Sequence, residues 1–187
     1  MRPLRVVLVG PECTGKTRLA GELAALYGVP WSREHAREYV DRHGAALAYA
    51  DVEPIARGQK QGEDVAIARA AAESAPLVVF DTDLVSTVVY SRHYYGECPP
   101  WIEEEAARRL GELYLLHHID VTWVADGRQR EQPERRPELF ERFRATLAGS
   151  RARVVPIRGP WQERRRHAVQ AIDGLLGAPA HAPGQSG

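Results

Sequence analysis

The most restrictive feature of this sequence is the segment GPECTGKT at residues 10–17. It matches the pattern G-x-x-x-x-G-K-[ST] at every fixed position, follows an apolar run and opens a helical pattern. In such a loop the glycines let consecutive N–H groups face phosphates, the lysine adds a positive charge, and the threonine hydroxyl ligates Mg²⁺. The segment therefore predicts a site for a nucleoside triphosphate and Mg²⁺. The expected ATP-binding residues here are Gly10, Pro11, Glu12, Cys13, Thr14, Gly15, Lys16, Thr17 and Arg18.

The bulk composition predicts one globular domain. The 187 residues are 44% hydrophobic and 27% charged, with a net charge of zero, which is ordinary for a single domain. Because no excess of positive charge is present to hold a phosphate backbone, we expect no nucleic-acid partner. We expect the domain over residues 1–176 and a flexible tail over 177–187, where little apolar surface is available to fold. Nothing in the sequence favours a particular oligomeric state.

The two cysteines, Cys13 and Cys98, belong to no CxxC pair and form no disulfide framework, which fits a reducing cytoplasm. No signal-peptide core and no stretch of about 18 apolar residues is present. We therefore expect a cytoplasmic protein without membrane contact. The sequence also lacks zinc-ligand spacing, a GxSxG elbow and the HRD and DFG motifs, so it does not support a zinc site, a hydrolase triad or the protein-kinase fold.

Short apolar runs alternate with longer helical patterns along the chain. Runs that end in Gly or Asp indicate buried strands at residues 5–10, 77–83, 119–126 and 153–159, with a weaker candidate at 28–34. Helical patterns lie at residues 16–27, 51–74, 101–118 and 161–176. This alternation predicts an α/β fold, a three-layer sandwich with a five-stranded parallel sheet between helices.

The segment VADGRQREQPERRPELFERF, residues 124–143, places a run of charge and two prolines after a predicted strand. A solvated surface loop is one interpretation. The other is a small Arg-rich lid at about residues 125–137, because loops at the carboxyl ends of parallel strands face the ligand and close over it. Under the second interpretation, Arg128 and Arg130 contact ATP.

The run LVVFDTD ends in two aspartates, Asp81 and Asp83. A phosphate loop needs a carboxylate at the end of a neighbouring strand, either to hold Mg²⁺ or to take the proton of the attacking hydroxyl. We favour Asp81 for this position, with Thr17 as the second metal ligand. Helix capping is the alternative for both aspartates. For Asp83, capping and substrate binding are evenly balanced.

Candidate acceptor-binding residues follow the weak strand and recur in an aromatic-rich region. Glu34 and Arg37, in the segment WSREHAREYV, are candidates, although their helical spacing with Glu38 equally fits a surface salt-bridge cluster. Aromatic rings that could stack on a planar base are further candidates, although such rings more often serve packing. These rings are Tyr90, Tyr94, Tyr95 and Trp101.

Four segments in this order, GPECTGKT, REHAREYV, FDTDLVSTVVYSRHYYG and WVADGRQR, resemble the ribosylnicotinamide kinase domain of NadR-type proteins. The resemblance runs from about residue 6 to residue 173. It implies a P-loop fold like that of nucleoside and nucleotide kinases. It also implies transfer of the ATP γ-phosphate to the 5′-hydroxyl of nicotinamide riboside, which gives nicotinamide mononucleotide for NAD salvage.

The same resemblance assigns roles to single residues. It implies that Glu34 and Arg37 lie near the acceptor, that Asp81 and Asp83 form the DTD motif, and that Arg128 is the lid arginine. Relatives of this type carry an adenylyltransferase domain ahead of the kinase and sometimes a DNA-binding segment. Because the phosphate loop begins at residue 10, we expect neither activity here.

The resulting hypothesis assigns catalysis to Lys16, Asp81, Glu34 and Arg128. Lys16 and the loop amides hold the phosphates, Thr17 and Asp81 hold Mg²⁺, and the lid excludes water. Either Asp81 or Glu34 accepts the proton of the acceptor hydroxyl. Two alternatives stay open: a kinase for another nucleoside or nucleotide, and a P-loop ATPase switch or regulator with slow chemistry.

Overall fold

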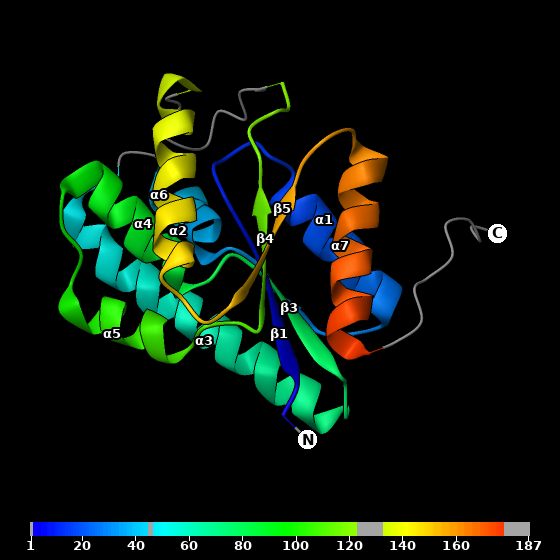
Figure 1. The fold of residues 1–187 in the computed structure, drawn as a ribbon. Helices are drawn as coiled ribbons and strands as arrows, with labels where there is room; N and C mark the ends of the chain where they lie inside the picture. Colours follow the sequence, from blue (N-terminus) through cyan, green and yellow to red (C-terminus); the bar gives the residue numbers. More distant parts are fainter. Residues whose placement is uncertain (1, 45–46, 123–132, 178–187) are drawn as a thin grey trace.

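The computed structural model describes residues 2–44, 47–122 and 133–177, in which strands and helices alternate (Figure 1). The strands are β1 (Leu4–Val9), β2 (Trp31–Ser32), β3 (Leu77–Asp81), β4 (Leu113–His117) and β5 (Arg153–Ile157). The α-helices are α1 (Lys16–Tyr27), α2 (His35–His43), α3 (Val52–Ala72), α4 (Leu84–Tyr95), α5 (Pro100–Arg108), α6 (Arg136–Ala148) and α7 (Trp161–Leu176). Short 3-10 helices, η1 (Tyr49–Asp51) and η2 (Pro133–Arg135), precede α3 and α6.

One parallel sheet contains the five strands in the order β2-β3-β1-β4-β5. The central strand, β1, pairs with β3 on one side and with β4 on the other. In this register Leu8 lies opposite Asp81, so the carboxyl end of β3 lies beside the start of the segment at residues 10–17. The predicted fold class, a parallel five-stranded α/β sandwich, is confirmed.

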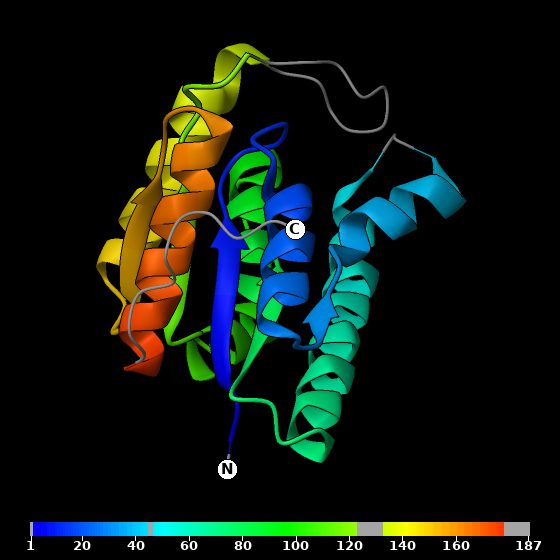
Figure 2. The ribbon, with the colours of Figure 1, turned by 90° about the vertical axis from the view of Figure 1, so that its right-hand side faces the viewer.

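Helices cover both faces of the sheet, as Figures 1 and 2 show. Val6 and Leu8 belong to a buried cluster with residues of α1 and α7, whereas Val7 and Val9 belong to a cluster with residues of α3, α4, α5 and α6. The alternation of side chains along β1 therefore fills both layers. The carboxyl ends of the strands meet at one edge, at the top in Figure 1, where ligands bind in sheets of this kind.

One predicted helix and one predicted strand are wrong. The helix expected at residues 101–118 ends as α5 at Arg108, and Leu113–His117 forms β4 instead. Leucine is a good helix former, so the run LYLLH locally favours a helix. Full burial between β1 and β5 overrides that preference. The strand expected at residues 119–126 does not form at residues 119–122, and residues 123–126 lie outside the described residues.

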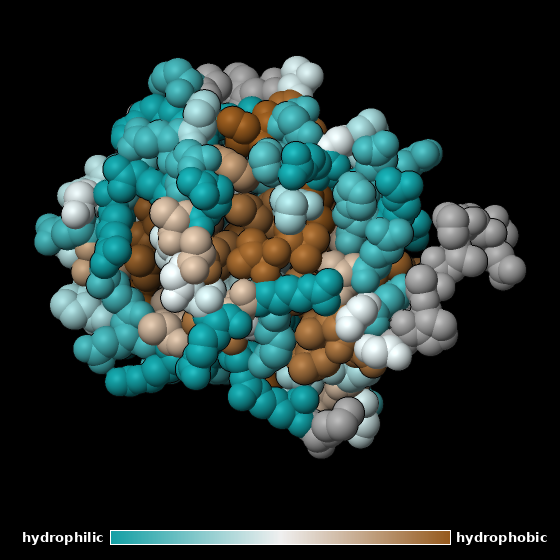
Figure 3. All heavy atoms as spheres, viewed as in Figure 1, coloured by the Kyte–Doolittle hydropathy of each residue, from teal (hydrophilic) through white to brown (hydrophobic). Residues whose placement is uncertain are grey.

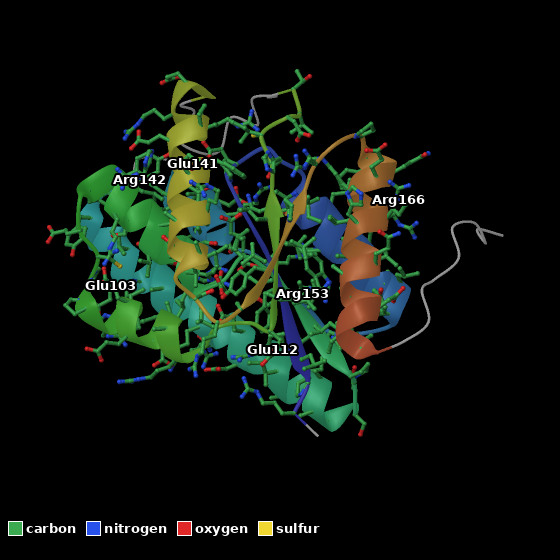
Figure 4. The ribbon with its side chains drawn as sticks, in the orientation of Figure 1. Glu103, Glu112, Glu141, Arg142, Arg153 and Arg166 are labelled. Carbon is green, nitrogen blue, oxygen red and sulfur yellow. The ribbon has the colours of Figure 1, made fainter. Side chains whose placement is uncertain are left out.

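The strand β5 forms one edge of the sheet. Figure 3 shows apolar surface between α6 and α7, where this strand lies, and its Val154 and Val155 are only half-buried. Pro156 has no N–H to offer another strand, and Arg153 places a charge on the same edge (Figure 4). Both features oppose edge-to-edge pairing of sheets.

Charged side chains cover the helices around this edge. Figure 4 labels Glu103 on α5, Glu141 and Arg142 on α6, and Arg166 on α7. Arg142 pairs with Glu138 one turn earlier at 2.9 Å. Exposed pairs at this spacing contribute about 0.3–0.5 kcal/mol each, so they solubilise the helices more than they stabilise them. Among the described residues, no helix is long and apolar enough to cross a membrane.

Candidate functional site

The segment at residues 10–17 forms a tight loop between β1 and α1. Gly10 and Gly15 have φ angles of 131° and 84°, which L side chains rarely adopt. A Cβ on Gly10 would also lie 2.7 Å from the His117 carbonyl oxygen, and a Cβ on Gly15 would lie 2.9 Å from the Trp161 ring. The loop therefore requires both glycines. Backbone N–H groups at the start of α1 are available to an anion, as expected for a phosphate loop.

Two buried side chains contact the backbone of this loop at the Thr14 carbonyl oxygen. His117 Nδ1 lies 3.0 Å from the Thr14 carbonyl oxygen, and Arg164 Nη1 donates to the same oxygen at 3.5 Å. Burial lowers the pKa of His117 to about 3, so the ring is neutral and its Nδ1–H donates to the carbonyl. Arg164 also donates to the Gly159 carbonyl at 2.9 Å and pairs with Asp120. These contacts join the loop to the ends of β4 and β5.

Two cations lie at the loop itself. The Lys16 ammonium donates to the Pro11 carbonyl at 2.8 Å, and the Thr14 hydroxyl donates to the same oxygen at 2.8 Å. Arg18 lies 4.1 Å from the centre of the Trp161 ring. Because that ring packs on Gly15, Arg18 stands beside the loop as a second positive charge, held by a cation–π contact.

Asp81 ends β3 next to the loop and has the properties of a magnesium ligand. Its side chain is fully buried, and its carboxylate oxygens have no hydrogen bond of regular geometry among the described residues, although the Thr17 hydroxyl lies near enough to favour the charged form. Burial raises the pKa of Asp81, while the neighbouring Thr17, Lys16 and Arg37 act in the opposite direction. Mg²⁺ is commonly bound by one or two protein oxygens together with phosphates and water. The buried carboxylate beside the Thr17 hydroxyl therefore fits this ion.

Asp83 caps α4. Its Oδ1 accepts from the Val85 N–H at 3.0 Å, and its Oδ2 accepts from the Tyr114 hydroxyl at 2.5 Å. Burial raises the pKa of Asp83 to about 6, against these hydrogen bonds. Both oxygens thus have protein partners, and the side chain is not among those that line the pocket beside the loop. The geometry matches the capping interpretation.

A pocket, the acceptor pocket, opens beside the loop between α2, α3 and α4. Val40, Val52 and Ile55 give it an apolar wall. A mostly apolar pocket with a few polar groups is typical of small-molecule sites. Four of the predicted substrate-binding residues line it together: Glu34, Tyr90, Tyr94 and Tyr95.

Glu12 joins the loop to this pocket. It belongs to the loop, yet its side chain lines the acceptor pocket and is only 6% exposed. The Tyr90 hydroxyl donates to Glu12 Oε2 at 3.1 Å. The Tyr90 ring in turn stacks on Tyr94, with centroids 6.1 Å apart and an interplanar angle of 14°. The aromatic side of the pocket is therefore fixed directly to the phosphate loop.

Glu34 occupies the N-cap position of α2 and lines the pocket close to the loop. Burial raises the pKa of Glu34 above its usual value. The positive charges of Lys16 and Arg37 act against this rise, and the negative charges of Asp81 and Glu12 add to it. A carboxylate with a raised pKa, between the phosphate loop and an acceptor pocket, has the properties of a general base. Arg37 acts on Glu34 without lining the pocket itself.

Gln59 of α3 supports the turn that carries Glu34. Its Oε1 accepts from the His35 N–H at 3.0 Å, and its Nε2 donates to the Thr82 carbonyl at 3.2 Å and to Glu63 at 3.3 Å. The amide is buried and has partners on both of its ends. It thereby links the start of α2 to the end of β3. Gln59 was not predicted from the sequence, because a glutamine within a helical pattern belongs to no motif.

Trp101, a predicted substrate contact, lies in a different region. It belongs to α5, and the Arg57 guanidinium lies 4.8 Å from the centre of its ring. Together with Lys60 and Glu105 the two residues line a separate groove between α3 and α5. The structure therefore does not bring Trp101 together with Glu34, and its contacts are those of packing.

Arg128 and Arg130, the predicted lid arginines, lie outside the described residues, as does most of the expected lid at 125–137. Within the described part, Arg136 begins α6 and is only 6% exposed. Its Nε and Nη2 have no hydrogen-bond partner among the described residues. Burial lowers the pKa of Arg164, and the charge of Arg136 adds to this, which places Arg136 near the anchor of the loop. Buried guanidinium nitrogens without hydrogen-bond partners are costly, and an anion would supply such partners.

The fold and the site together define a class of protein, a P-loop nucleotide-binding protein built like a small-molecule kinase, with a phosphate loop and an acceptor pocket side by side. The chain belongs to the AAA domain family AAA_28, whose model matches residues 5–164. Its similarity to NadR is confirmed as well. The trifunctional NAD biosynthesis/regulator protein NadR of Escherichia coli (strain K12) is 32% identical over an alignment of 127 residues, and the match covers 65% of this chain and 30% of that protein.

Solved structures extend the comparison over nearly the whole chain. A NadR protein in complex with NR superimposes with a TM-score of 0.82 and 25% identity, over 98% of this chain and 53% of the other. A NadR structure with NAD and AMP-PNP gives a TM-score of 0.76. A thymidylate kinase from Ehrlichia chaffeensis gives a TM-score of 0.59 at 14% identity over 94% of this chain and 100% of its own length, which shows the shared fold alone. This chain spans about a third of the curated NadR proteins and about half of the NadR structures.

Proposed function

We propose that this protein transfers the γ-phosphate of ATP to the 5′-hydroxyl of nicotinamide riboside, forming ADP and nicotinamide mononucleotide. One observation carries the proposal: the acceptor pocket, with its aromatic side, opens directly beside the phosphate loop and is lined by Glu34. The similarity to a NadR protein solved with NR supports this acceptor. The placement serves transfer between two bound substrates, because phosphoryl transfer depends mainly on alignment and charge neutralisation.

The lining of the pocket favours a nucleoside over a nucleotide as the acceptor. A nucleoside monophosphate brings a dianionic group, which proteins hold with arginine or lysine. Among the described lining residues there is no arginine, lysine or histidine, and two carboxylates are present, Glu12 and Glu34. These charges would repel an acceptor phosphate. The proposed acceptor carries none.

In the proposed reaction, the O5′ atom of the acceptor attacks the γ-phosphorus while the bond from that phosphorus to the β,γ-bridging oxygen breaks and ADP leaves. Glu34 accepts the O5′ proton, which assigns the base role to Glu34 and leaves Asp81 for the metal. Lys16 neutralises charge on the β- and γ-phosphates, and Arg136 adds a further cation from α6. Mg²⁺, held by Thr17 and Asp81, would supply further charge neutralisation when bound.

A single assay tests the proposal. The chain is incubated with ATP, Mg²⁺ and one acceptor at a time from a panel of nicotinamide riboside, adenosine, uridine, thymidine and thymidine monophosphate, and products are identified by mass spectrometry. Nicotinamide mononucleotide as the main product supports the proposal. A product from another acceptor instead would show a kinase of different specificity. ATP binding with no phosphorylated acceptor would point to a P-loop switch or regulator.

A further inference from the structure

Two charged side chains are found among the described lining residues of the acceptor pocket, and both are acidic. Glu34 lies at the start of α2, and Glu12 belongs to the phosphate loop. The remaining lining residues are apolar, hydroxyl-bearing or amide side chains, such as Ile55, Ser86 and Gln59. A pocket with low-dielectric walls and charges of one sign concentrates its electric field on the ligand. The charged groups in the described lining of the acceptor pocket are therefore both negative.

Glu12 is unexpected at its position. The loop that carries it binds polyphosphate, which a neighbouring carboxylate repels. The side chain instead turns into the acceptor pocket, where it is 6% exposed and accepts a hydrogen bond from Tyr90 at 3.1 Å. Burial raises the pKa of Tyr90 well above its usual value, and the charge of Glu12 adds to this, so the phenol stays a neutral donor. Tyr90 thus fixes Glu12 without neutralising its charge.

Glu12 lies on the aromatic side of the pocket, although its charge still acts on Glu34. Of the charged groups that act on Glu34, Lys16 has the largest effect, which places Glu34 toward the phosphate loop. The Glu12 carboxylate accepts a hydrogen bond from Tyr90, whose ring stacks on Tyr94. The Glu12 carboxylate therefore lies toward the aromatic side of the pocket. A planar ring of the acceptor that stacks on this side comes close to the Glu12 carboxylate.

One further side chain in the pocket lacks a partner. Ser86 lines the pocket and is only 4% exposed, and its Oγ has no hydrogen-bond partner among the described residues. Buried hydroxyls are normally hydrogen-bonded, so an unpartnered one in a pocket points to a ligand. It offers a hydrogen bond to a neutral polar substituent, such as a carboxamide, which complements an acceptor ring that carries both a positive charge and an amide.

We propose that Glu12 is a specificity determinant that selects acceptors whose aromatic ring carries a positive charge. The inference rests on the proposed function and adds a residue and a physical basis for its selectivity. A cationic ring compensates the buried carboxylate and gains an attraction that solvent screens weakly. A neutral ring of the same shape removes water from the carboxylate without replacing that interaction. The pyridinium ring of nicotinamide riboside is a cation of this class.

The test uses two acceptors that differ in ring charge. Nicotinamide riboside is a cation, and its 1,4-dihydro form is neutral with the same ribose and the same carboxamide. For the wild type, we expect kcat/KM to favour the cation by about tenfold or more, as for an ion pair at a partly buried site. In Glu12→Gln, which keeps an oxygen for the Tyr90 hydroxyl, the preference should fall by about tenfold, mainly through a higher KM for the cation.

Two control variants separate charge from other effects. Tyr90→Phe removes the hydrogen bond to Glu12 but keeps the carboxylate, so the preference for the cation should persist even where the overall rate falls. Glu73→Gln removes an exposed carboxylate just beyond α3, outside the pocket lining, and should leave the ratio of the two kcat/KM values unchanged. Thermal unfolding of each variant checks that the fold is intact.

The outcomes decide between the inference and the proposed function. An equal loss of kcat/KM for both acceptors in Glu12→Gln would overturn the inference, because Glu12 would then act on the shared ribose or on the loop. If the wild type phosphorylates neither acceptor, the proposed function is wrong, and calorimetric binding of the two nucleosides becomes the readout. Tighter binding of the cation that Glu12→Gln abolishes would still support charge selection. Equal binding of both, or none, would refute it.

Discussion

The Lys16 ammonium lies 2.8 Å from the Pro11 carbonyl oxygen, so the lysine of the phosphate loop is held against its own loop by a buried hydrogen bond. This contact positions the charge before a nucleotide arrives, which reduces the reorganisation needed during transfer. The second lysine of the chain, Lys60, lies on α3 and pairs with Glu105 at 3.4 Å. The two lysines therefore provide a matched comparison.

We expect Lys16→Ala to lower kcat by about 10²–10³-fold, the usual loss when a preorganised charge-stabilising group is removed. Lys60→Ala should retain the wild-type rate within about twofold, because a surface ion pair contributes at most about 1 kcal/mol. Steady-state formation of nicotinamide mononucleotide measures both. A fully active Lys16→Ala variant would show that the loop does not hold the transferred phosphate.

The pH dependence should report the ionisation of Glu34. Since burial raises its pKa from the usual value of 4.5, and a base must be ionised to accept a proton, kcat/KM should fall on the acid side at a pH above 4.5. Because Asp81 interacts with Glu34, the acid limb of the pH–rate profile reports the ionisation of both carboxyl groups together. Glu34→Gln should lower kcat by about 10²–10⁴-fold.

Substitutions of two residues that act on Glu34 should shift the acid limb of the pH–rate profile in opposite directions. Glu12 raises the pKa of Glu34, so Glu12→Gln should shift the acid limb to lower pH, whereas Arg37 lowers that pKa, so Arg37→Gln should shift it to higher pH. Rate profiles that extend from acid to neutral pH measure the shifts. Equal shifts in one direction would contradict the assignment of Glu34 as the base.

The sequence predicted the elements whose signals are local. The loop of residues 10–17 is defined by adjacent positions, and apolar β-branched runs identified β1, β3 and β5, although β5 is an edge strand that is only partly buried. The strand β4 was missed because its leucines favour a helix, and only its pairing with β1 and β5 reveals it. Local propensity is a weak predictor wherever such long-range pairing decides the conformation.

The candidate site also contains some residues that the local sequence identifies and others that only the structure reveals. Glu34 and the three tyrosines were found as residue types that suit an acceptor, and the structure brings them to one pocket. The anchors of the loop were not found, because His117 and Arg164 lie 103 and 150 residues from Thr14 in the sequence. Glu12 was expected only in the ATP site. Its second role depends on the direction of a side chain, which a loop motif does not specify.

Substitution by methionine should stabilise the protein at Arg136 and destabilise it at Arg164. Arg136 is buried, and two of its nitrogens have no partner among the described residues, so Arg136→Met should raise the free energy of unfolding by about 1–4 kcal/mol in the absence of nucleotide. If this cation serves the phosphates, kcat/KM for ATP should fall by about tenfold or more in the same variant. Urea unfolding and steady-state kinetics measure the two effects.

Arg164→Met provides the matched control. Its guanidinium donates to the carbonyls of Gly159, Thr14 and His118 and pairs with Asp120. Its loss should destabilise the protein by about 3–5 kcal/mol, because buried acceptors lose their partner. If Arg136→Met and Arg164→Met destabilised the protein equally, Arg136 would have a structural role and would not serve as a binding group for an anion.

Gln59→Met should affect the acceptor more than ATP. The substitution keeps a similar volume but leaves the His35 N–H and the Thr82 carbonyl without their buried partner, at a cost of about 1–3 kcal/mol for each group. Because the His35 N–H follows directly after Glu34, the base loses its fixed position. We expect the KM for nicotinamide riboside to rise several-fold while the KM for ATP changes little. Gln61→Met, an exposed glutamine on the same helix, is the control and should leave both constants unchanged. If Gln59→Met raised both KM values equally, Gln59 would support the whole domain instead of the acceptor side.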